Sequence, residues 1–98
     1  MKTKLEEASE IINEIDAQMI SLFIKRMAAV SMVAEYKLAN NIDVLDTSRE
    51  ASLKKKNLEL LSNKMLEEYY LTFLDGVLKS SKDYQKALLE SYSGNKNE

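Results

Sequence analysis

One long uninterrupted helical pattern limits what this chain can fold into. From Leu5 to about Ala39 there is no proline or glycine, and apolar residues recur at steps of three and four. These are Ala8, Ile12, Ile15, Met19, Leu22, Ala29, Val30 and Val33. A helix of about 35 residues would be roughly 50 Å long, whereas a compact domain of this size has a radius of gyration of about 13 Å. We therefore expect the helix to find a partner outside its own chain, in an intertwined helical homodimer.

Two further helices are predicted after this one. Asn40 and Asn41 suit a helix end, and residues 42–45 suit a connector. A second helix is expected from about residue 48 to residue 61, followed by a short loop at residues 62–64. The chain contains no proline and only two glycines, and it is rich in good helix formers. The predicted fold class is therefore all-α, with three helices.

The third predicted helix spans about residues 65–92. Its apolar stripe consists of Leu66, Tyr69, Phe73, Val77, Tyr84 and Leu88. Gly76 lies inside it at a cost of about 1 kcal/mol relative to alanine, which indicates close packing at that point. Residues 1–92 are expected to form a single domain, and residues 93–98 a flexible tail.

The composition excludes several classes of function. The chain has no cysteine and no histidine, so thiol nucleophiles, imidazole bases, disulfides and most transition-metal sites are excluded. The net charge is −2 with both signs interspersed, which disfavours nucleic acid as a partner. Any enzyme built from this chain would use carboxylates, lysine, arginine, hydroxyls and amides, which suits electrostatic catalysis.

The amino-terminal residues do not resemble a signal peptide, and we expect no segment to approach the roughly 20 apolar residues that span a bilayer. The expected location is cytoplasmic. A domain of this length buries only about 60–65% of its unfolded surface, so oligomerisation would help to stabilise it.

Two cations interrupt the apolar stripe of the first helix. Arg26 and Lys37 occupy stripe positions eleven residues apart, which returns them to within about 20° of one another around the helix, with Val30 and Val33 between them. Such a pair could grip a small anion over an apolar floor. Alternatively, both side chains could extend to the rim or pair with carboxylates across the bundle.

The third helix repeats this feature with neutral groups. Ser81 and Gln85 lie one turn apart on its stripe, and each offers a hydrogen-bonding group. An isolated buried polar pair is more often satisfied within the protein than by a ligand. Two helices that both present polar groups inward favour a ligand site.

The segment VLDTSRE, residues 44–50, matches a capping box in which Thr47 caps a helix and Glu50 reaches back to it. Asp46 could be the cap instead. Neither arrangement explains Arg49, a cation in the first helical turn, where the helix dipole disfavours it.

Taken together, these residues resemble the pocket of the all-helical chorismate mutases, the AroQ class. The resemblance covers about residues 5–92 and includes IINEID, LFIKRMAAVSMVAEYK, VLDTSRE and SSKDYQ. It implies an intertwined dimer of three-helix chains that rearranges chorismate to prephenate in aromatic amino-acid biosynthesis (the shikimate pathway), with no cofactor. Such a reaction needs a compactly held dianion and a donor to the ether oxygen.

The resemblance also implies roles for individual residues. Arg26 would bind a substrate carboxylate, with Arg49 and Asp46 shaping the pocket around it. Lys37 and Gln85 would donate to the ether oxygen, and Glu50 would accept from the substrate hydroxyl. Ser81 would help to bind a carboxylate, and Val33 and Leu78 would form an apolar wall.

One family residue is absent. The family has an arginine near the start of the first helix that crosses the dimer to the second carboxylate, and Ser9 stands at that position. The resemblance therefore implies a mutase that is weak by itself, unless Lys2, Lys4 or a partner enzyme completes the site. The alternative is a non-catalytic or partner-dependent helical module that binds an aromatic-pathway metabolite. An isochorismate-pyruvate lyase has the same fold but uses the same missing arginine.

Overall fold

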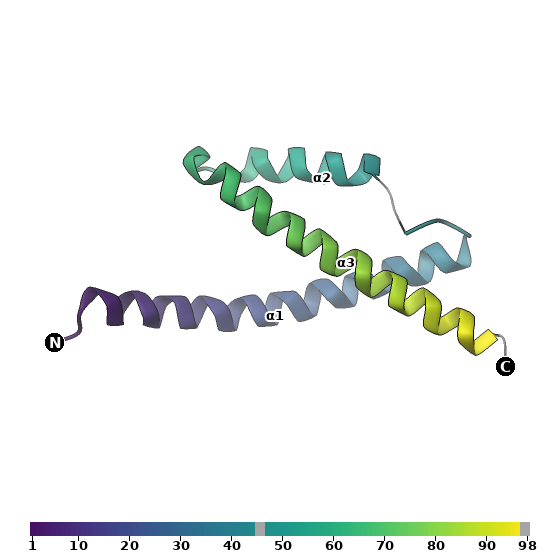
Figure 1. Ribbon diagram of the computed structural model, residues 1–98, viewed down its shortest axis with the longest axis horizontal. Coiled ribbons are helices and arrows are strands. Elements are labelled where there is room, and N and C mark those ends of the chain that lie inside the picture. Colours follow the sequence, from purple (N-terminus) through teal and green to yellow (C-terminus); the bar gives the residue numbers. More distant parts are fainter. Residues whose placement is uncertain (45–46, 97–98) are drawn as a thin grey trace.

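The computed structural model describes residues 1–44 and 47–96, with backbone alone for Thr47 and for residues 93–96. It contains α1 (Lys4–Ala39), α2 (Thr47–Leu60), a short 3₁₀ helix η1 (Lys64–Leu66) and α3 (Glu67–Lys96). No strand occurs among these described residues, so the all-α prediction is confirmed. Figure 1 shows α3 crossing the carboxyl-terminal half of α1, with α2 running back beside α3.

Local sequence signals fix both ends of α1. Thr3 caps its start, because the Thr3 hydroxyl accepts a hydrogen bond of 3.1 Å from the backbone N–H of Glu6. At the other end Asn41 adopts a left-handed φ of 54°. The Ile42 N–H then donates to the Lys37 carbonyl at 2.9 Å, which is the Schellman pattern of helix termination. The predicted helix end at the two asparagines is confirmed.

The core of the single chain is small and lies where α1 meets α3. Its buried apolar residues are Val30, Ala34, Leu74 and Leu78. Three polar side chains, Lys37, Ser81 and Gln85, are buried beside them. The carboxyl-terminal half of α1 therefore packs on α3 through a mixture of apolar and polar contacts.

Polar contacts join α2 to α3. Lys54 pairs with Asp75 at 2.9 Å, and the Asn57 amide donates to the Tyr70 hydroxyl at 3.2 Å. Asp75 raises the pKa of Lys54, chiefly through the hydrogen bond that it accepts from the lysine. None of the described α2 side chains, residues 48–60, is buried.

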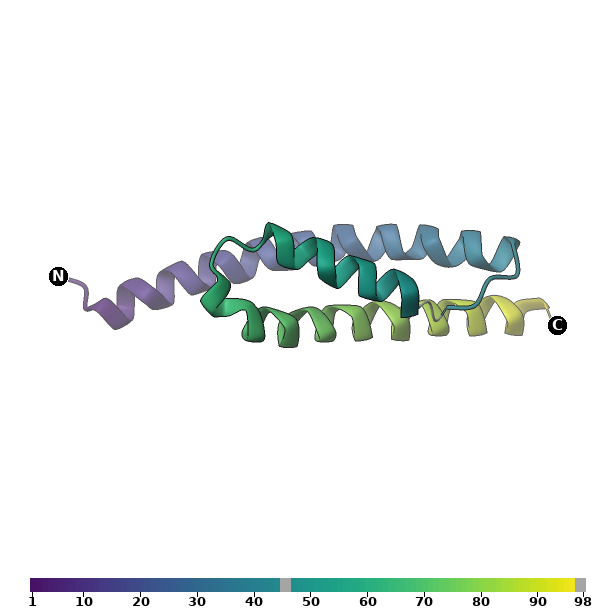
Figure 2. The ribbon, with the colours of Figure 1, turned by 90° about the horizontal axis from the view of Figure 1, so that it is seen from above.

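The amino-terminal half of α1 extends beyond the other helices (Figure 2). Every residue from Met1 to Lys25 is exposed, including nine large apolar residues of α1. They are Leu5, Ile11, Ile12, Ile15, Met19, Ile20, Leu22, Phe23 and Ile24. The radius of gyration is 17.7 Å, well above the value of about 13 Å for a compact domain of this size.

Within the described residues, α1 is long and apolar enough to cross a membrane, judged by length and composition alone. The expectation that no segment approaches this limit was wrong. Core helices of water-soluble proteins pass the same test. Lys25 and Arg26 also lie near the middle of α1, and a cation at the centre of a bilayer costs about 2.5–3.5 kcal/mol.

Three details of α3 differ from the sequence-based expectation. Its buried face carries Leu74, Leu78, Ser81 and Gln85, whereas Leu66, Tyr69 and Phe73 of the predicted stripe are exposed. Apart from its chain neighbours and the backbone of its own helix, an alanine methyl group at Gly76 would meet no atom within 4 Å, so the predicted close packing there is wrong within the single chain. The helix also continues to Lys96, beyond its predicted end at residue 92.

Candidate functional site

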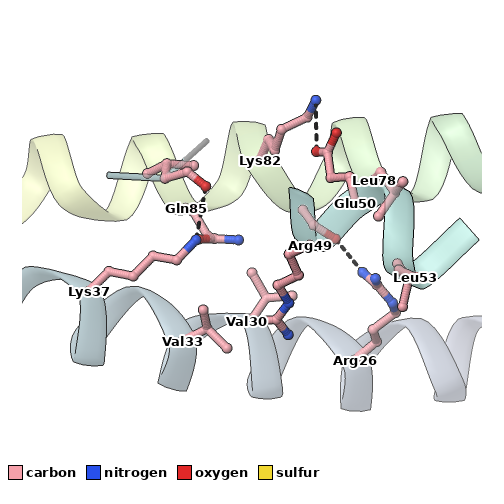
Figure 3. Close-up of a pocket in the computed structure, with 12 residues that line it drawn as sticks. Arg26, Val30, Val33, Lys37, Arg49, Glu50, Leu53, Leu78, Lys82 and Gln85 are labelled. Carbon is pink, nitrogen blue, oxygen red and sulfur yellow. Dashed lines mark hydrogen bonds and ion pairs between the residues drawn. The ribbon is translucent and has the colours of Figure 1, made fainter. Parts of the chain in front are cut away.

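A pocket lies between the carboxyl-terminal half of α1, the start of α2 and the middle of α3 (Figure 3). It contains about 600 Å³ of space, part of it open to solvent. Its lining residues are Arg26, Val30, Val33, Lys37, Val44, Arg49, Glu50, Leu53, Leu78, Ser81, Lys82 and Gln85. Eight of the nine site residues predicted from sequence are brought together here, and the ninth, Asp46, lies outside the described residues.

Lys37 is the most deeply buried cation of this pocket, at 9% exposure. Its Nζ donates to the Val44 carbonyl at 2.9 Å and to Gln85 Oε1 at 3.1 Å. Both acceptors are neutral, and burial of a charge is costly unless an opposite charge compensates it. A buried ammonium held by neutral acceptors suits a site whose anion arrives with the ligand.

Gln85 is oriented by the same contact. Because Lys37 donates to its carbonyl oxygen, the NH₂ group of the Gln85 amide must point the other way, and Figure 3 shows it directed along the pocket. Lys37 and Gln85 therefore present two N–H donor groups from α1 and α3 side by side.

Arg26 and Ser81 form the second contact between α1 and α3. A guanidinium N–H of Arg26 donates to the Ser81 hydroxyl oxygen, and that hydroxyl donates to the Val77 carbonyl at 3.0 Å. The Ser81 proton is thus used within α3. In this arrangement Ser81 orients the guanidinium, and donation to a ligand would require it to give up its bond to Val77.

The start of α2 supplies Arg49 and Glu50. Arg49 extends from α2 toward α1 (Figure 3). Glu50 forms an ion pair with Lys82 at 3.1 Å, on the side of the pocket away from α1. The predicted cap involves Asp46 and the Thr47 side chain, which lie outside the described part of the chain, so that prediction remains untested.

Val30, which was expected in the apolar floor, also lines the pocket, and sequence reasoning missed the other three lining residues, Val44, Leu53 and Lys82. Lys82 follows Ser81 directly and precedes Gln85 by three residues, so its position on the same face of α3 could have been inferred. Leu53 lies one turn after Arg49 and Glu50 on α2. Val44 could not be placed from sequence, because it belongs to the connector.

The charged residues that line the described part of the pocket are mostly cations. Four described cations line it, Arg26, Lys37, Arg49 and Lys82, whereas Glu50 is the one described carboxylate. Its apolar surface comes from Val30, Val33, Leu53 and Leu78. Among the described residues, no group of three or more carboxylates could hold a metal ion. The arrangement fits a small organic anion with an apolar body, bound by charge and by directed N–H donors.

Ser9 stands where the family has its arginine, and the side chains at and near this position lie outside the pocket. Ser9 is exposed on the extended half of α1. Lys2, which could substitute for the arginine, folds along the helix to pair with Glu10 at 2.6 Å. Lys4 is the exposed first residue of α1. None of these three side chains lines the pocket of its own chain.

Comparison with known proteins gives two findings. The family model described as chorismate mutase type II matches residues 9–86. The chain is also 33% identical over 87 residues to a bifunctional chorismate mutase/prephenate dehydratase of Buchnera aphidicola subsp. Schizaphis graminum (strain Sg). That match covers 88% of this chain and 23% of the relative, so the chain spans about a quarter of the relative's length. No solved structure matches.

Proposed function

The chain belongs to the chorismate mutase type II family, and we propose that it rearranges chorismate to prephenate in the pocket described above. The reaction is an isomerisation in which an ether C–O bond breaks as a C–C bond forms. The observation that carries the proposal is the buried Lys37 ammonium, which has two neutral acceptors and lies beside the outward-facing Gln85 amide.

Catalysis in this proposal is electrostatic. Negative charge grows on the ether oxygen as its bond to carbon breaks, and fixed donors that meet this charge lower the barrier. Lys37 and Gln85 would donate to that oxygen. Because their mutual hydrogen bond already orients both groups, little reorganisation is needed during the reaction.

The remaining residues would bind and compact the substrate. Arg26, held by Ser81, would bind one carboxylate with help from Arg49. Glu50 would accept a hydrogen bond from the substrate hydroxyl, and Asp46 would shape the same end of the pocket. Val33 and Leu78 line the pocket as its apolar wall. A substrate held in this way is close to the reactive conformation.

We also propose that two chains form an intertwined homodimer. The single chain has an accessible surface of 8009 Å². A compact monomer of 11.2 kDa is expected to expose about 5,700 Å². The excess is about 2,300 Å² per chain, or about 4,600 Å² for two chains, which lies in the range of total area that obligate dimers bury. Sedimentation across a concentration series tests this proposal, and a folded monomer at every concentration would contradict it.

The direct test of function is chorismate consumption by the purified protein, with product analysis. We expect prephenate formation that Arg26→Ala reduces by at least about tenfold, since a charged hydrogen bond contributes about 1.5–3 kcal/mol. Lys25→Ala is the matched control, because Lys25 is exposed on α1 and does not line the pocket. Full activity of Arg26→Ala would show that the reaction does not take place in this pocket.

A second candidate is a helical module that binds an aromatic-pathway metabolite without turnover. Ser9, at the position of the family's crossing arginine, favours it. Binding of chorismate without prephenate formation, by both the wild-type chain and Ser9→Arg, would support this candidate. We further propose that the chain acts in the cytoplasm beside a prephenate-consuming enzyme, since the relative is named for a mutase and a prephenate dehydratase.

A further inference from the structure

Lys82 lies on the pocket-facing side of α3. It sits between Ser81 and Gln85 in sequence and lines the pocket with them. Its Nζ pairs with Glu50 Oε1 at 3.1 Å, and the two side chains are 36% and 25% exposed. Figure 3 shows this pair at the edge of the pocket away from α1, where it joins α3 to α2.

Glu50 can compete with an anionic ligand. Besides Lys82, three cations line the pocket with it, Arg26, Lys37 and Arg49. A glutamate side chain has three rotatable bonds, and its carboxylate is attracted to these cations by the same forces that attract a carboxylate of the ligand. Unless something restrains it, Glu50 can turn into the space that the ligand needs.

We infer that Lys82 is a positioning residue that holds the Glu50 carboxylate at the pocket edge, away from Arg26, Lys37 and Arg49. There the carboxylate remains available to accept a hydrogen bond from a ligand hydroxyl. This inference rests on the proposed function, because Lys82 acts on the ligand only through Glu50.

This role makes a specific kinetic prediction. Loss of the Lys82 cation allows Glu50 to occupy the anion position in the free enzyme, so a ligand must displace it before binding. Such competition weakens ground-state and transition-state binding alike, which raises KM and leaves kcat nearly unchanged. The pair is partly exposed, so we expect a rise in KM of about three- to tenfold.

The test is a double-mutant cycle on chorismate turnover with wild-type, Lys82→Gln, Glu50→Gln and the double variant. Lys82→Gln should raise KM alone, and Lys82→Arg, which keeps the cation, should restore it. In the Glu50→Gln background Lys82→Gln should have no further effect, because the carboxylate that Lys82 would hold in place has been removed. Lys86→Gln is the matched control, since Lys86 is exposed on α3 and does not line the pocket.

Circular dichroism is the check that each variant is folded. An equal rise in KM in both backgrounds would mean that Lys82 acts on the ligand directly, and would overturn the inference. Unchanged kinetics of Lys82→Gln in an active protein would overturn this inference alone. Absence of turnover in the wild-type protein would overturn the proposed function together with it.

Discussion

The two halves of α1 have opposite surfaces. The amino-terminal half, up to about Lys25, is exposed all round although it carries nine large apolar residues. The carboxyl-terminal half buries Val30 and Ala34, and it also buries the cation Lys37. One half therefore exposes apolar surface that the single chain does not bury, whereas the other buries a charge beside its apolar contacts. In the proposed dimer the first half would serve assembly, whereas the second half lines the pocket.

The largest effect is expected from breaking the amino-terminal half. Ile12→Asp combined with Met19→Asp places charges on the exposed apolar surface that we assign to the dimer. Burial of each side chain contributes about 1.5–3 kcal/mol, and a buried charge adds a further cost. We expect loss of the dimer and of cooperative unfolding, measured by sedimentation and thermal melting.

The matched control for that variant is Asn13→Asp with Gln18→Asp. It adds the same charge to exposed polar positions on the same half of α1. Equal behaviour of the two double variants would show that the apolar residues are not an interface.

The second-largest effect is expected from a substitution in the carboxyl-terminal half of α1. Lys37→Met keeps the length of the side chain and removes the buried cation that we place on the ether oxygen. We expect kcat/KM to fall by at least about a hundredfold, as for other donors to a developing oxyanion. The dimer should persist in sedimentation experiments. Full activity of Lys37→Met would contradict the proposed role of the lysine.

A gain of function would connect the two halves. Ser9→Arg restores the residue that the family resemblance places across the dimer. A charged hydrogen bond contributes about 1.5–3 kcal/mol, so we expect kcat/KM to rise by about ten- to a hundredfold. Ser9→Gln is the uncharged control and should leave the rate near that of the wild type. No gain would mean that this half of α1 does not reach a partner's pocket.

The smallest effect is expected on the solvent face of α3. Lys79 pairs with Asp83 at 2.7 Å with both side chains largely exposed. The hydrogen bond from Lys79 lowers the pKa of Asp83 below its ordinary value of 3.8. The pair therefore contributes to stability above that pH, and the contribution is lost as the pH falls through the lowered pKa.

Lys79→Gln should accordingly lower the melting temperature only slightly at pH 7 and not at all well below the lowered pKa. Solvent screens exposed pairs, so the effect at neutral pH is small. Activity should stay within about twofold of wild type, because Lys79 does not line the pocket. A large loss of activity would show that the solvent face of α3 contributes to the site.

Helix periodicity explains why much of the fold and the site could be predicted. The spacing of Arg26, Val30, Val33 and Lys37 fixes their common face whatever packs against it, and the structure places all four on one pocket. Asn41 was predictable because a left-handed residue is common at helix ends. Such features depend on local geometry, which the sequence determines directly.

The parts that could not be predicted depend on contacts with other elements. A helix of 30 residues carries apolar side chains on more than one face, so the sequence does not say that Leu74 and Leu78 are buried while Tyr69 and Phe73 are exposed. The face of α3 on which Lys82 lies could be inferred from its spacing, but a lysine on a helix is usually a solvated residue, so the sequence did not assign it a function. Its role in the site follows only from the position of Glu50 on α2.

The lack of buried side chains among residues 48–60 has a consequence for dynamics. A helix held by partly exposed polar contacts belongs to the least stable part of a fold, and its backbone amides should exchange with solvent faster than those of α3. This helix nevertheless carries Arg49 and Glu50. A bound anion would therefore slow amide exchange most strongly in α2. Part of the binding free energy would offset the entropy lost when α2 becomes ordered.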